Sequence, residues 1–407
     1  MLNYDELDAF VQPNSIAVIG ASERPGSWGA YIMQGILSRD YNGKVYPINP
    51  SAKRIFGVPA FKDIREIDKS VELAILAVPA ESVEQVVIAC GQKGVKGLIM
   101  ITAGFAETSE NGKAEQNILT KTAHSYGMRI LGPNVSGAFN LRHGFYAAYL
   151  PIKDLVSSPL AGICQGGYAV YDIMTSASSV GMGLGKFIHT GNESDLTVTD
   201  FLDRFRHNPE VEGVVMYLET LRDGERFIEI ARDFTMEKPL VVYKGGRTSG
   251  SKRAAQSHTG AMSGDWVLFQ GLLKQAGVVL SPTIELLLPL GHALIERPPM
   301  KGAQVGIVTI GGSWGVILSD FIEEARLFVP ELSMSLQKEI RALGIPERAS
   351  IKNPVDMGAS GLSMNEDLML EVGRKILLSG EVNALVLHGI GSPGLLSKHI
   401  SDEQRSV

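Results

Sequence analysis

Cysteine is scarce in this chain, and long apolar runs are missing. Only two cysteines occur among 407 residues, Cys90 and Cys164, and no CxxC pair is present. Neither a disulfide framework nor a zinc site is indicated, so a reducing compartment is expected. No window reaches the ~18 consecutive apolar residues of a membrane span, and the acidic start MLNYDELDAF is unlike a signal peptide. We therefore expect a cytoplasmic protein with no membrane partner.

An excess of positive charge is also missing. The 38 Lys and Arg residues are outnumbered by 44 Asp and Glu, which gives a net charge of −6. Such a chain offers no basic surface for DNA or RNA, so no nucleic-acid partner is expected. Hydrophobic residues make up 44% and charged residues 20%, which is typical of a globular α/β enzyme. The length exceeds one ordinary core and predicts several domains.

Two common nucleotide-binding motifs are absent as well. The sequence has no GxxxxGK[ST] loop for a nucleoside triphosphate, and the glycine loop Gly20–Gly29 is longer than the tight GxGxxG of dinucleotide enzymes. The second predicted strand, KVYPINP, ends in Asn49, where an Asp or Glu would hold a ribose. A nicotinamide oxidoreductase is therefore a disfavoured alternative, which NADH binding would test.

Short apolar strands alternate with helices in three successive units. The first unit contains SIAVIG, KVYPINP, LAILAV, GLIMITAGF and RILGPN; the pattern restarts at LAGICQGG and again at QVGIVT. This alternation predicts an α/β fold of parallel, doubly wound sheets. We expect a Rossmann-like domain over residues 1–140, a flavodoxin-like domain over 151–297 and a second flavodoxin-like domain over 301–407. The last has fewer strands, so either the sequence ends inside it or another chain completes its sheet.

The loop Gly20–Gly29 follows the first predicted strand and precedes a helix. Such a loop points backbone N–H groups and a helix N-terminus at an anion. Arg24 lies in it, and Lys44, Lys53 and Arg54 follow nearby, charges that suit a cofactor rich in phosphate. The alternatives are a plain strand-to-helix connection and ordinary surface charges.

One histidine has an unusual context. His258 stands in SHTGAMSG, among small residues that let a phosphoryl group come close to the backbone. An imidazole can attack phosphorus if a carboxylate fixes its second ring nitrogen. Glu219, at the end of VVMYLE, is the candidate carboxylate, and CQGG and KGGRT are candidate anion-binding turns. The arrangement predicts phosphoryl transfer, with a structural histidine and a surface acid as alternatives. His189, in IHTGN, stays open.

Ten segments in a fixed order resemble the NDP-forming acyl-CoA synthetases, relatives of succinyl-CoA ligase. They are IGASERPGSWG, VYPINP, AVPAESV, ITAGFAE, ILGPNVSG, KFIHTGNESD, VVMYLET, VYKGGRT, SHTGAMSG and IKNPVD. The resemblance covers nearly the whole chain and matches the family's α portion. It implies interconversion of acyl-CoA, ADP and phosphate with a carboxylic acid, CoA and ATP, through an acyl phosphate and a phosphohistidine.

The resemblance also implies roles for individual residues. His258 maps to the phosphohistidine and Glu219 to its carboxylate partner, with no metal ligand in this chain. Phosphate and acid are implied to contact Cys164, Gln165, Gly166, Gly167 and Asn192. CoA is implied to contact Gly20, Ser22, Arg24, Pro25, Gly26, Ser27, Gly29, Pro47, Asn49, Val78, Pro79, Gly104, Phe105 and Asn134.

A nucleotide site is not among these segments. In the family it belongs to an ATP-grasp portion, either a β subunit or a fused segment, and nothing in these residues resembles one. The resemblance therefore implies a partner that brings ADP or ATP and Mg²⁺, and an oligomeric assembly. The carboxylic acid and phosphate are implied as small-molecule partners, but the acid itself is not specified.

Five positions depart from the family's usual residues, three of them in one segment. The family usually has SQSGA where this chain has CQGGY from Cys164, so two hydroxyls that would bind phosphate, each worth roughly 1.5–3 kcal/mol, are missing. Thr220 and Gly245 stand where the family often has Gly and Ser. Cys164 begins a helix, where a thiol can be activated, although a buried inert thiol is the preferred interpretation.

These departures keep other functions open. Because His258, Glu219 and Asn192 are all present, we expect catalysis to be retained. The main alternative is a non-catalytic or regulatory CoA-binding protein, whose CoA affinity would not change in His258→Ala. A fragment of a fused lysine acetyltransferase is a further alternative, but no segment here resembles that domain.

Overall fold

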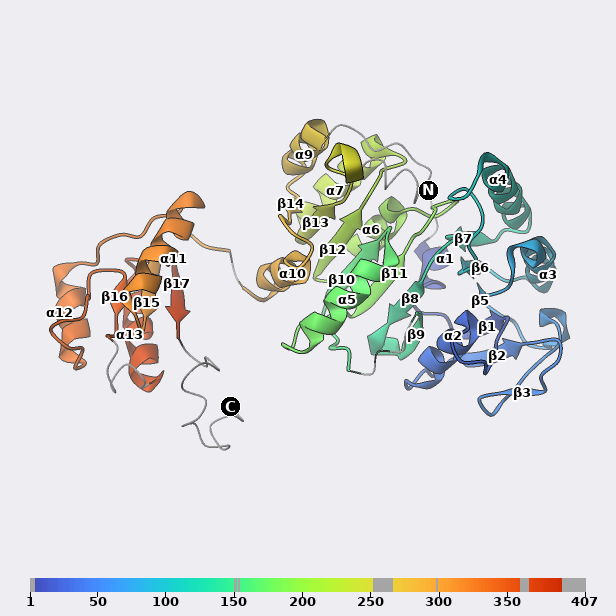
Figure 1. Cartoon of the computed structure of the whole chain (residues 1–407), viewed down its shortest axis with the longest axis horizontal. Coiled ribbons are helices and arrows are strands. Elements are labelled where there is room, and N and C mark those ends of the chain that lie inside the picture. The colour runs from blue at the N-terminus through green and yellow to red at the C-terminus, as the bar shows by residue number, and fades with distance from the viewer. Residues whose placement is uncertain are drawn as a thin grey trace. The chain divides into compact units, whose positions relative to one another are not determined.

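The computed structural model describes residues 4–149, 152, 154–251, 266–297, 299–358 and 366–389. The chain divides into two compact units, Met1–Arg297 and Pro298–Val407, and each is described by itself below (Figure 1). Both are built of parallel strands and helices, which confirms the predicted α/β class. Within the described residues, no helix has the length and apolar character needed to cross a bilayer.

The first sheet has five parallel strands in the order β2-β1-β5-β6-β7. Every residue of β1, β5 and β6 is buried, as expected for a parallel sheet covered on both faces. Its strands are β1 (Ser15–Ile19), β2 (Lys44–Ile48), β5 (Leu73–Leu76), β6 (Gly97–Met100) and β7 (Arg129–Leu131). The other elements of this region are α1 (Tyr4–Asp8), α2 (Trp28–Leu37), α3 (Val83–Lys93), α4 (Glu110–Ser125), the 3₁₀ turns η1 (Ile64–Glu66) and η2 (Ala80–Ser82), and the short antiparallel pair β3 (Arg54–Ile55) and β4 (Val58–Pro59).

Local sequence sets the ends of these helices. Ser27 caps α2 because its side chain accepts a hydrogen bond from the Ala30 N–H at 3.3 Å, and Ser109 caps α4 in the same way. Gly94 ends α3 in the left-handed conformation, with φ of 78°. The cap at Ser27 fixes where the glycine loop stops and α2 begins.

The second sheet has seven strands in the order β14-β13-β12-β10-β11-β8-β9. The first five are parallel, and β8 and β9 are antiparallel additions at one edge. The strands are β8 (Gly137–Asn140), β9 (Phe145–Ala148), β10 (Leu160–Cys164), β11 (Lys186–His189), β12 (Gly213–Leu218), β13 (Leu240–Lys244) and β14 (Val279–Leu280). The other elements are η3 (Leu141–His143), α5 (Gly167–Ser178), α6 (Val198–Arg206), α7 (Gly224–Thr235), α9 (Trp266–Gln275) and α10 (Leu287–Glu296).

The end of the predicted first domain lies in the second sheet. Strand β8, which falls within residues 1–140, pairs with β11 of the second sheet. The cause is aromatic packing: Phe139 stacks on Tyr146 of β9 with ring centroids 5.3 Å apart and on Phe187 of β11 at 5.4 Å. The chain therefore leaves the first sheet after β7, and the hairpin β8–β9 forms one edge of the second sheet.

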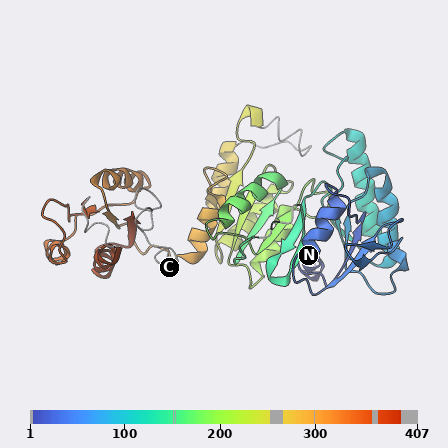
Figure 2. The ribbon, with the colours of Figure 1, turned by 60° about the horizontal axis from the view of Figure 1, so that its bottom comes forward.

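One apolar core joins the two sheets of the first unit. Buried residues of β1, such as Ile16 and Val18, belong to the same cluster as Ala161 and Ile163 of β10 and Met216 of β12. Helix α2 lies beside β9 in both views (Figures 1 and 2). The contact is so close that a Cβ added at Gly35 would lie 2.7 Å from the Tyr146 carbonyl oxygen. The first and second sheets are therefore packed as one body.

The second unit contains a three-stranded parallel sheet in the order β16-β15-β17. Its strands match the predicted segments QVGIVT, KNPVDM and ALVLHGI. They pack on a core that includes Val308, Val355 and Ile376. The elements are β15 (Val305–Thr309), β16 (Val355–Asp356), β17 (Ala384–His388), α11 (Gly312–Glu324), α12 (Met334–Ala342) and α13 (Glu366–Leu378).

Candidate functional site

A cavity of about 640 Å³ lies at the carboxyl ends of β1, β5, β6 and β7. Strand β1 has β2 on one side and β5 on the other, so the cavity lies where strand order reverses, the usual ligand site of open α/β sheets. Its wall also reaches the second sheet through His189. The lining residues are Gly20, Ser22, Arg24, Gly26, Ser27, Trp28, Gly29, Ala77, Val78, Pro79, Ala80, Ile101, Thr102, Ala103, Asn134, Val135, Ser136, Tyr149 and His189.

The glycine loop fits tightly between β1 and α2. A Cβ added at Gly29 would lie 2.0 Å from the carbonyl oxygen of Gly20, and one added at Gly20 would lie 2.3 Å from that of Ala77. Only glycine allows this approach, which brings the N-terminus of α2 to the cavity wall. A helix N-terminus and its free N–H groups favour a bound anion, so the loop is suited to phosphate groups.

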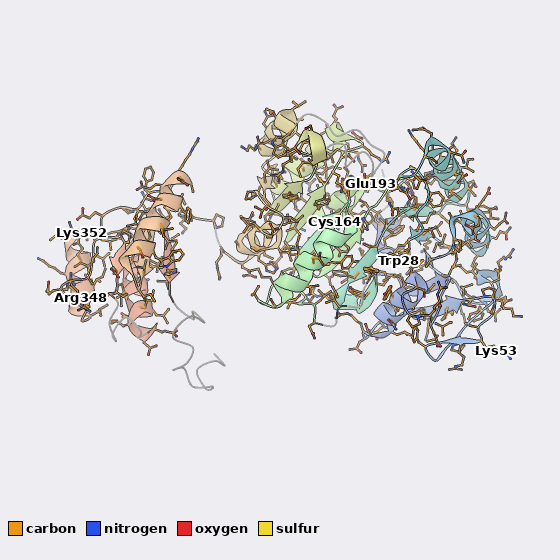
Figure 3. The ribbon with its side chains drawn as sticks, viewed as in Figure 1. Trp28, Lys53, Cys164, Glu193, Arg348 and Lys352 are labelled. Atoms are coloured by element: carbon orange, nitrogen blue, oxygen red, sulfur yellow. The ribbon has the colours of Figure 1, made fainter. Side chains whose placement is uncertain are left out.

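The structure brings together nine of the fourteen residues that the sequence assigned to CoA. Four basic residues were expected to suit a cofactor rich in phosphate. Arg24 lines the cavity, whereas Lys44, Lys53 and Arg54 do not. Figure 3 shows Lys53 at the outer edge of the first domain, away from Trp28. The nine lining residues are Gly20, Ser22, Arg24, Gly26, Ser27, Gly29, Val78, Pro79 and Asn134.

The remaining five residues, Pro25, Pro47, Asn49, Gly104 and Phe105, are not among those that line the cavity. Phe105 is buried in the core beside α4, and Pro47 is buried in β2. Asn49 donates a hydrogen bond to the Ala21 carbonyl at 2.8 Å and accepts two from the turn that follows it. Asn49 therefore supports the glycine loop, and its expected contact with CoA remains a prediction.

Gln165 connects the ends of β10 and β12 with its side chain. Its Oε1 accepts hydrogen bonds from the Glu219 N–H at 2.7 Å and the Thr220 N–H at 2.9 Å. Its Nε2 donates to the Thr220 carbonyl at 2.9 Å. All three residues are buried. This amide fixes the turn that carries Glu219, at the entrance to helix α5.

The Glu219 carboxylate is buried, with 7% of the residue exposed. Its Oε1 accepts a hydrogen bond from the Tyr217 hydroxyl at 3.1 Å. Burial, followed by the nearby Glu219 charge, raises the pKa of Tyr217, so this hydroxyl keeps its proton and stays a donor. Lys244 donates from Nζ to the Glu219 carbonyl oxygen at 2.6 Å. The carboxylate is thus held in a defined orientation.

Two of the departures from the family's usual residues lie against Tyr217. A Cβ added at Gly166 would lie 2.9 Å from the Tyr217 ring and 3.2 Å from the Glu219 carboxylate, and one added at Gly245 would lie 2.9 Å from the Tyr217 hydroxyl. Gly166 is the N-cap of α5, and Gly167 is its first residue. The backbone N–H groups at the start of a helix favour a bound anion.

Cys164 is a buried free thiol. It ends β10 with 2% of the residue exposed, and burial raises the pKa of its thiol well above the usual range, with the Glu219 charge adding to the shift. The preferred interpretation from the sequence is confirmed. What Cys164 contributes is its carbonyl oxygen, which accepts a hydrogen bond from the Thr190 N–H at 2.8 Å.

The side-chain amide of Asn192 is hydrogen-bonded to residues of the first domain. Its Nδ2 donates to Gln116 at 3.0 Å and to the Glu107 carboxylate, which occupies both amide protons. Its Oδ1 accepts from Asn134 at 3.3 Å. Asn192 thus joins the loop after β11 to the first domain, beside the cavity residue Asn134, and its expected contact with phosphate remains a prediction.

His189 bridges the cavity and the second sheet. Its Nδ1 lies 2.7 Å from the Ser136 nitrogen, whose N–H can only donate, so the ring proton is on Nε2. That proton is donated to the Gln165 carbonyl at 2.8 Å. A hydrogen-bonded path therefore runs from the cavity wall through Ser136, His189 and Gln165 to the turn of Glu219. Its strand-end position was the only sequence signal for this role.

His258 lies outside the described residues, as does the rest of segment 252–265. Its closeness to Glu219 remains a prediction. On either side of it, Lys244 ends β13 and Trp266 begins α9. Among the residues that the structure does describe, no cluster of three or more His, Cys, Asp or Glu side chains could hold a metal ion.

Known proteins match this chain over both sheets. A family model described as a CoA binding domain matches residues 14–139, and one described as a succinyl-CoA ligase like flavodoxin domain matches residues 157–294. The α subunit of ADP-forming acetate–CoA ligase II of Pyrococcus furiosus is 39% identical over 87% of this chain and 76% of its own. The ADP-forming acetate–CoA ligase of Methanocaldococcus jannaschii is 34% identical over 86% of this chain and 49% of its own. A solved structure of acetyl-coenzyme A synthetase 1 of Ca. Korarchaeum cryptofilum, in complex with phosphate and ADP, is 32% identical over 94% of this chain and 82% of its own, with a TM-score of 0.86.

Proposed function

The chain belongs to the family of ADP-forming acyl-CoA ligases, with their α subunit as its counterpart, and we propose that it interconverts acyl-CoA, phosphate and ADP with a carboxylic acid, CoA and ATP. The observation that carries the proposal is the hydrogen-bonded connection from the cavity wall, through His189 and Gln165, to the backbone N–H of Glu219. The cavity and this turn both belong to the compact unit Met1–Arg297, which supports the proposal.

The reaction proceeds in three transfers. A phosphate oxygen attacks the thioester carbonyl and the C–S bond breaks, so CoA leaves as a thiolate that takes the proton given up by phosphate. A ring nitrogen of His258 then attacks phosphorus in the acyl phosphate, and the carboxylate leaves as the P–O bond breaks. A terminal oxygen of ADP finally attacks phosphorus in the phosphohistidine, and the N–P bond breaks, which regenerates the imidazole of His258. Glu219 accepts the other ring N–H of His258 and stabilises the imidazolium.

The first domain supplies the CoA site. The N-terminus of α2 and the glycine loop bind the phosphates, with Arg24 as the charged side chain in the wall. The ends of β5 and β7 carry the apolar and amide groups that face the rest of the molecule, among them Val78, Pro79 and Asn134. The tight packing at Gly29 supports this assignment because a side chain there would displace the loop.

The nucleotide and Mg²⁺ belong to an ATP-grasp partner, in a cytoplasmic oligomer. Two observations support the partner: one relative is an α subunit, and this chain spans about half of the Methanocaldococcus jannaschii relative. Cys90 and Cys164 are both buried free thiols, in keeping with a reducing compartment.

The test is acid-labile, base-stable ³²P labelling of the purified chain by acyl-CoA and labelled phosphate, across a panel of acyl-CoAs. We expect label on the wild type and none on His258→Ala, with CoA binding retained by both. If label is absent, the experiment is repeated with the β subunit of a family member. CoA binding without label in both settings would contradict the proposal and favour a non-catalytic CoA-binding protein, the alternative that the glycines at 166 and 245 keep open.

Tyr217→Phe should slow this labelling about tenfold, because a hydrogen bond to a charged group contributes roughly 1.5–3 kcal/mol and only part of that is used in the transition state. Tyr243→Phe is the matched control, since Tyr243 stacks on Tyr217 with centroids 6.0 Å apart. The initial rate of label incorporation is the measurement. If Tyr217 acts through Glu219, the double variant Tyr217→Phe with Glu219→Gln should incorporate label at the same rate as Glu219→Gln alone. A further loss of rate in the double variant would show that Tyr217 has a separate role.

A further inference from the structure

Glu193 is a buried carboxylate that the proposed reaction does not use. It lies in the loop after β11, and 2% of its side chain is exposed. Figure 3 shows it where the second sheet meets the first domain. We propose that Glu193 is a positioning residue, which joins the loop beside the cavity to the turn that carries Glu219. This role rests on the proposed function and adds to it a residue that is not among those expected from the sequence.

The loop after β11 is anchored to the first domain through its backbone. The Asn192 N–H donates to the Pro133 carbonyl at 3.0 Å, and the Ser194 N–H donates to the Gly132 carbonyl at 3.0 Å. Both carbonyls directly precede Asn134, which lines the cavity. The two hydrogen bonds therefore fix this loop against the part of the first domain that forms the cavity wall.

Glu193 stands between these two anchored residues, and its backbone is left-handed, with φ of 52°. A residue with a side chain rarely adopts this conformation, and keeps it where the surrounding contacts enforce it. One such contact is at the start of α6, where Oε1 of Glu193 accepts from the Val198 N–H at 3.0 Å. A helix N-terminus favours a carboxylate, so the start of α6 helps to hold Glu193 in this conformation.

The same carboxylate contacts both sides of the Glu219 turn. Gln165 donates a side-chain hydrogen bond to it, and Gln165 also accepts from the Glu219 N–H at 2.7 Å. Further along the turn, Nε of Arg222 lies 4.0 Å from Oε2 of Glu193. The Arg222 Nη2 also donates to the Asn192 carbonyl at 2.6 Å. Glu193 therefore holds the turn from one side through Gln165 and from the other through Arg222.

The groups that contact the Glu193 carboxylate are donors. Burial raises the pKa of this carboxyl, while hydrogen bonds from Val198, Thr190 and Gln165 lower it. The Arg222 guanidinium is also a donor. An amide at this position, as in Glu193→Gln, turns an N–H₂ group toward other donors, so part of the set of hydrogen bonds is lost.

The experiment compares Glu193→Gln with Asp195→Asn. Asp195 is a buried carboxylate of the same loop, with 4% of its side chain exposed, and its partner is Arg129 of β7 at 2.6 Å. The control therefore removes an equal charge from an ion pair with the first domain. One measurement on the full chain is the initial rate of ³²P labelling, over a range of concentrations of the acyl-CoA that labels wild type fastest. The other is hydrogen–deuterium exchange of the peptide 217–222.

We expect Glu193→Gln to lower the maximal labelling rate about 10- to 100-fold. The acyl-CoA concentration that gives half of this rate should change less than about twofold, and the peptide 217–222 should exchange at least about threefold faster. Asp195→Asn should stay within about twofold of wild type in all three quantities. If Glu193→Gln does not fold, Arg222→Gln tests the same contact from a side chain that is 43% exposed, and Arg222→Lys, which keeps the charge, should lose less rate.

The outcomes separate this role from the proposed function. Wild-type rate and exchange in Glu193→Gln and Arg222→Gln, or equal losses in Asp195→Asn, would overturn the role of Glu193 and leave the proposed function intact. A lower rate without faster exchange would also overturn it, because Glu193 would then act without moving the turn. No label on wild type, with or without the β subunit of a family member, would contradict the proposed function and this role with it.

Discussion

Glu219→Gln is expected to lower the rate of phosphohistidine formation by about 10²–10⁴-fold, by analogy with the loss of the anchoring carboxylate in other histidine-centred sites. The substitution keeps the shape of the side chain and its contact with the Tyr217 hydroxyl, but it removes the negative charge. The amide can present its N–H₂ to the imidazole, which favours the wrong tautomer, and it cannot stabilise the imidazolium. The initial rate of ³²P incorporation is the measurement.

The matched control for this experiment is Glu225→Gln. Glu225 is an exposed acid in the first turn of α7, so its loss removes the same charge without touching the site. We expect its labelling rate to stay within about twofold of wild type. A Glu219→Gln chain that labels at the wild-type rate, with CoA binding unchanged, would remove Glu219 from the reaction.

Gly29→Ala should weaken CoA binding by about 10- to 100-fold, equivalent to about 1.4–2.7 kcal/mol. The added methyl group would lie 2.0 Å from the Gly20 carbonyl oxygen. Since that oxygen belongs to the backbone, the loop or the start of α2 has to move. Overpacking of this kind typically costs about 1–3 kcal/mol of stability. Calorimetric titration with CoA measures the loss, and thermal unfolding shows whether the variant is folded.

Gly224→Ala provides the comparison for this glycine. A Cβ at Gly224 meets nothing within 4 Å, and the residue begins α7, away from the glycine loop. Its affinity for CoA should equal that of wild type. If Gly29→Ala binds CoA as tightly as Gly224→Ala does, the loop is not part of the CoA site and the cavity needs another ligand.

The sequence predicts the sheets well because their strands are short apolar runs between turn residues. SIAVIG, LAGICQGG and QVGIVT mark β1, β10 and β15. The same pattern does not say which sheet a strand joins, which is why β8 within residues 1–140 pairs with β11. That choice depends on Phe139 packing against Phe187, a contact between distant segments.

Candidate site residues could be proposed from the sequence only where a characteristic residue type directly follows or ends a predicted strand. The glycine loop and Glu219 satisfy that condition. Amide side chains do not, because their partners come from distant segments: Asn49 turns to Ala21, and Asn192 turns to Gln116. Trp28 also lines the cavity, but no polar group marks it in the sequence. The ring that it contacts, Tyr149, is distant in sequence.

The continuous core beneath both sheets has a thermodynamic consequence. Ile16 of β1 and Met216 of β12 share one apolar cluster, so unfolding the first sheet would also strip apolar contacts from the strand that leads to Glu219. A ligand that binds the folded state stabilises it by mass action, by about 2.7 kcal/mol at a hundred times its Kd. A ligand bound at the glycine loop would therefore also stabilise the strand that leads to Glu219.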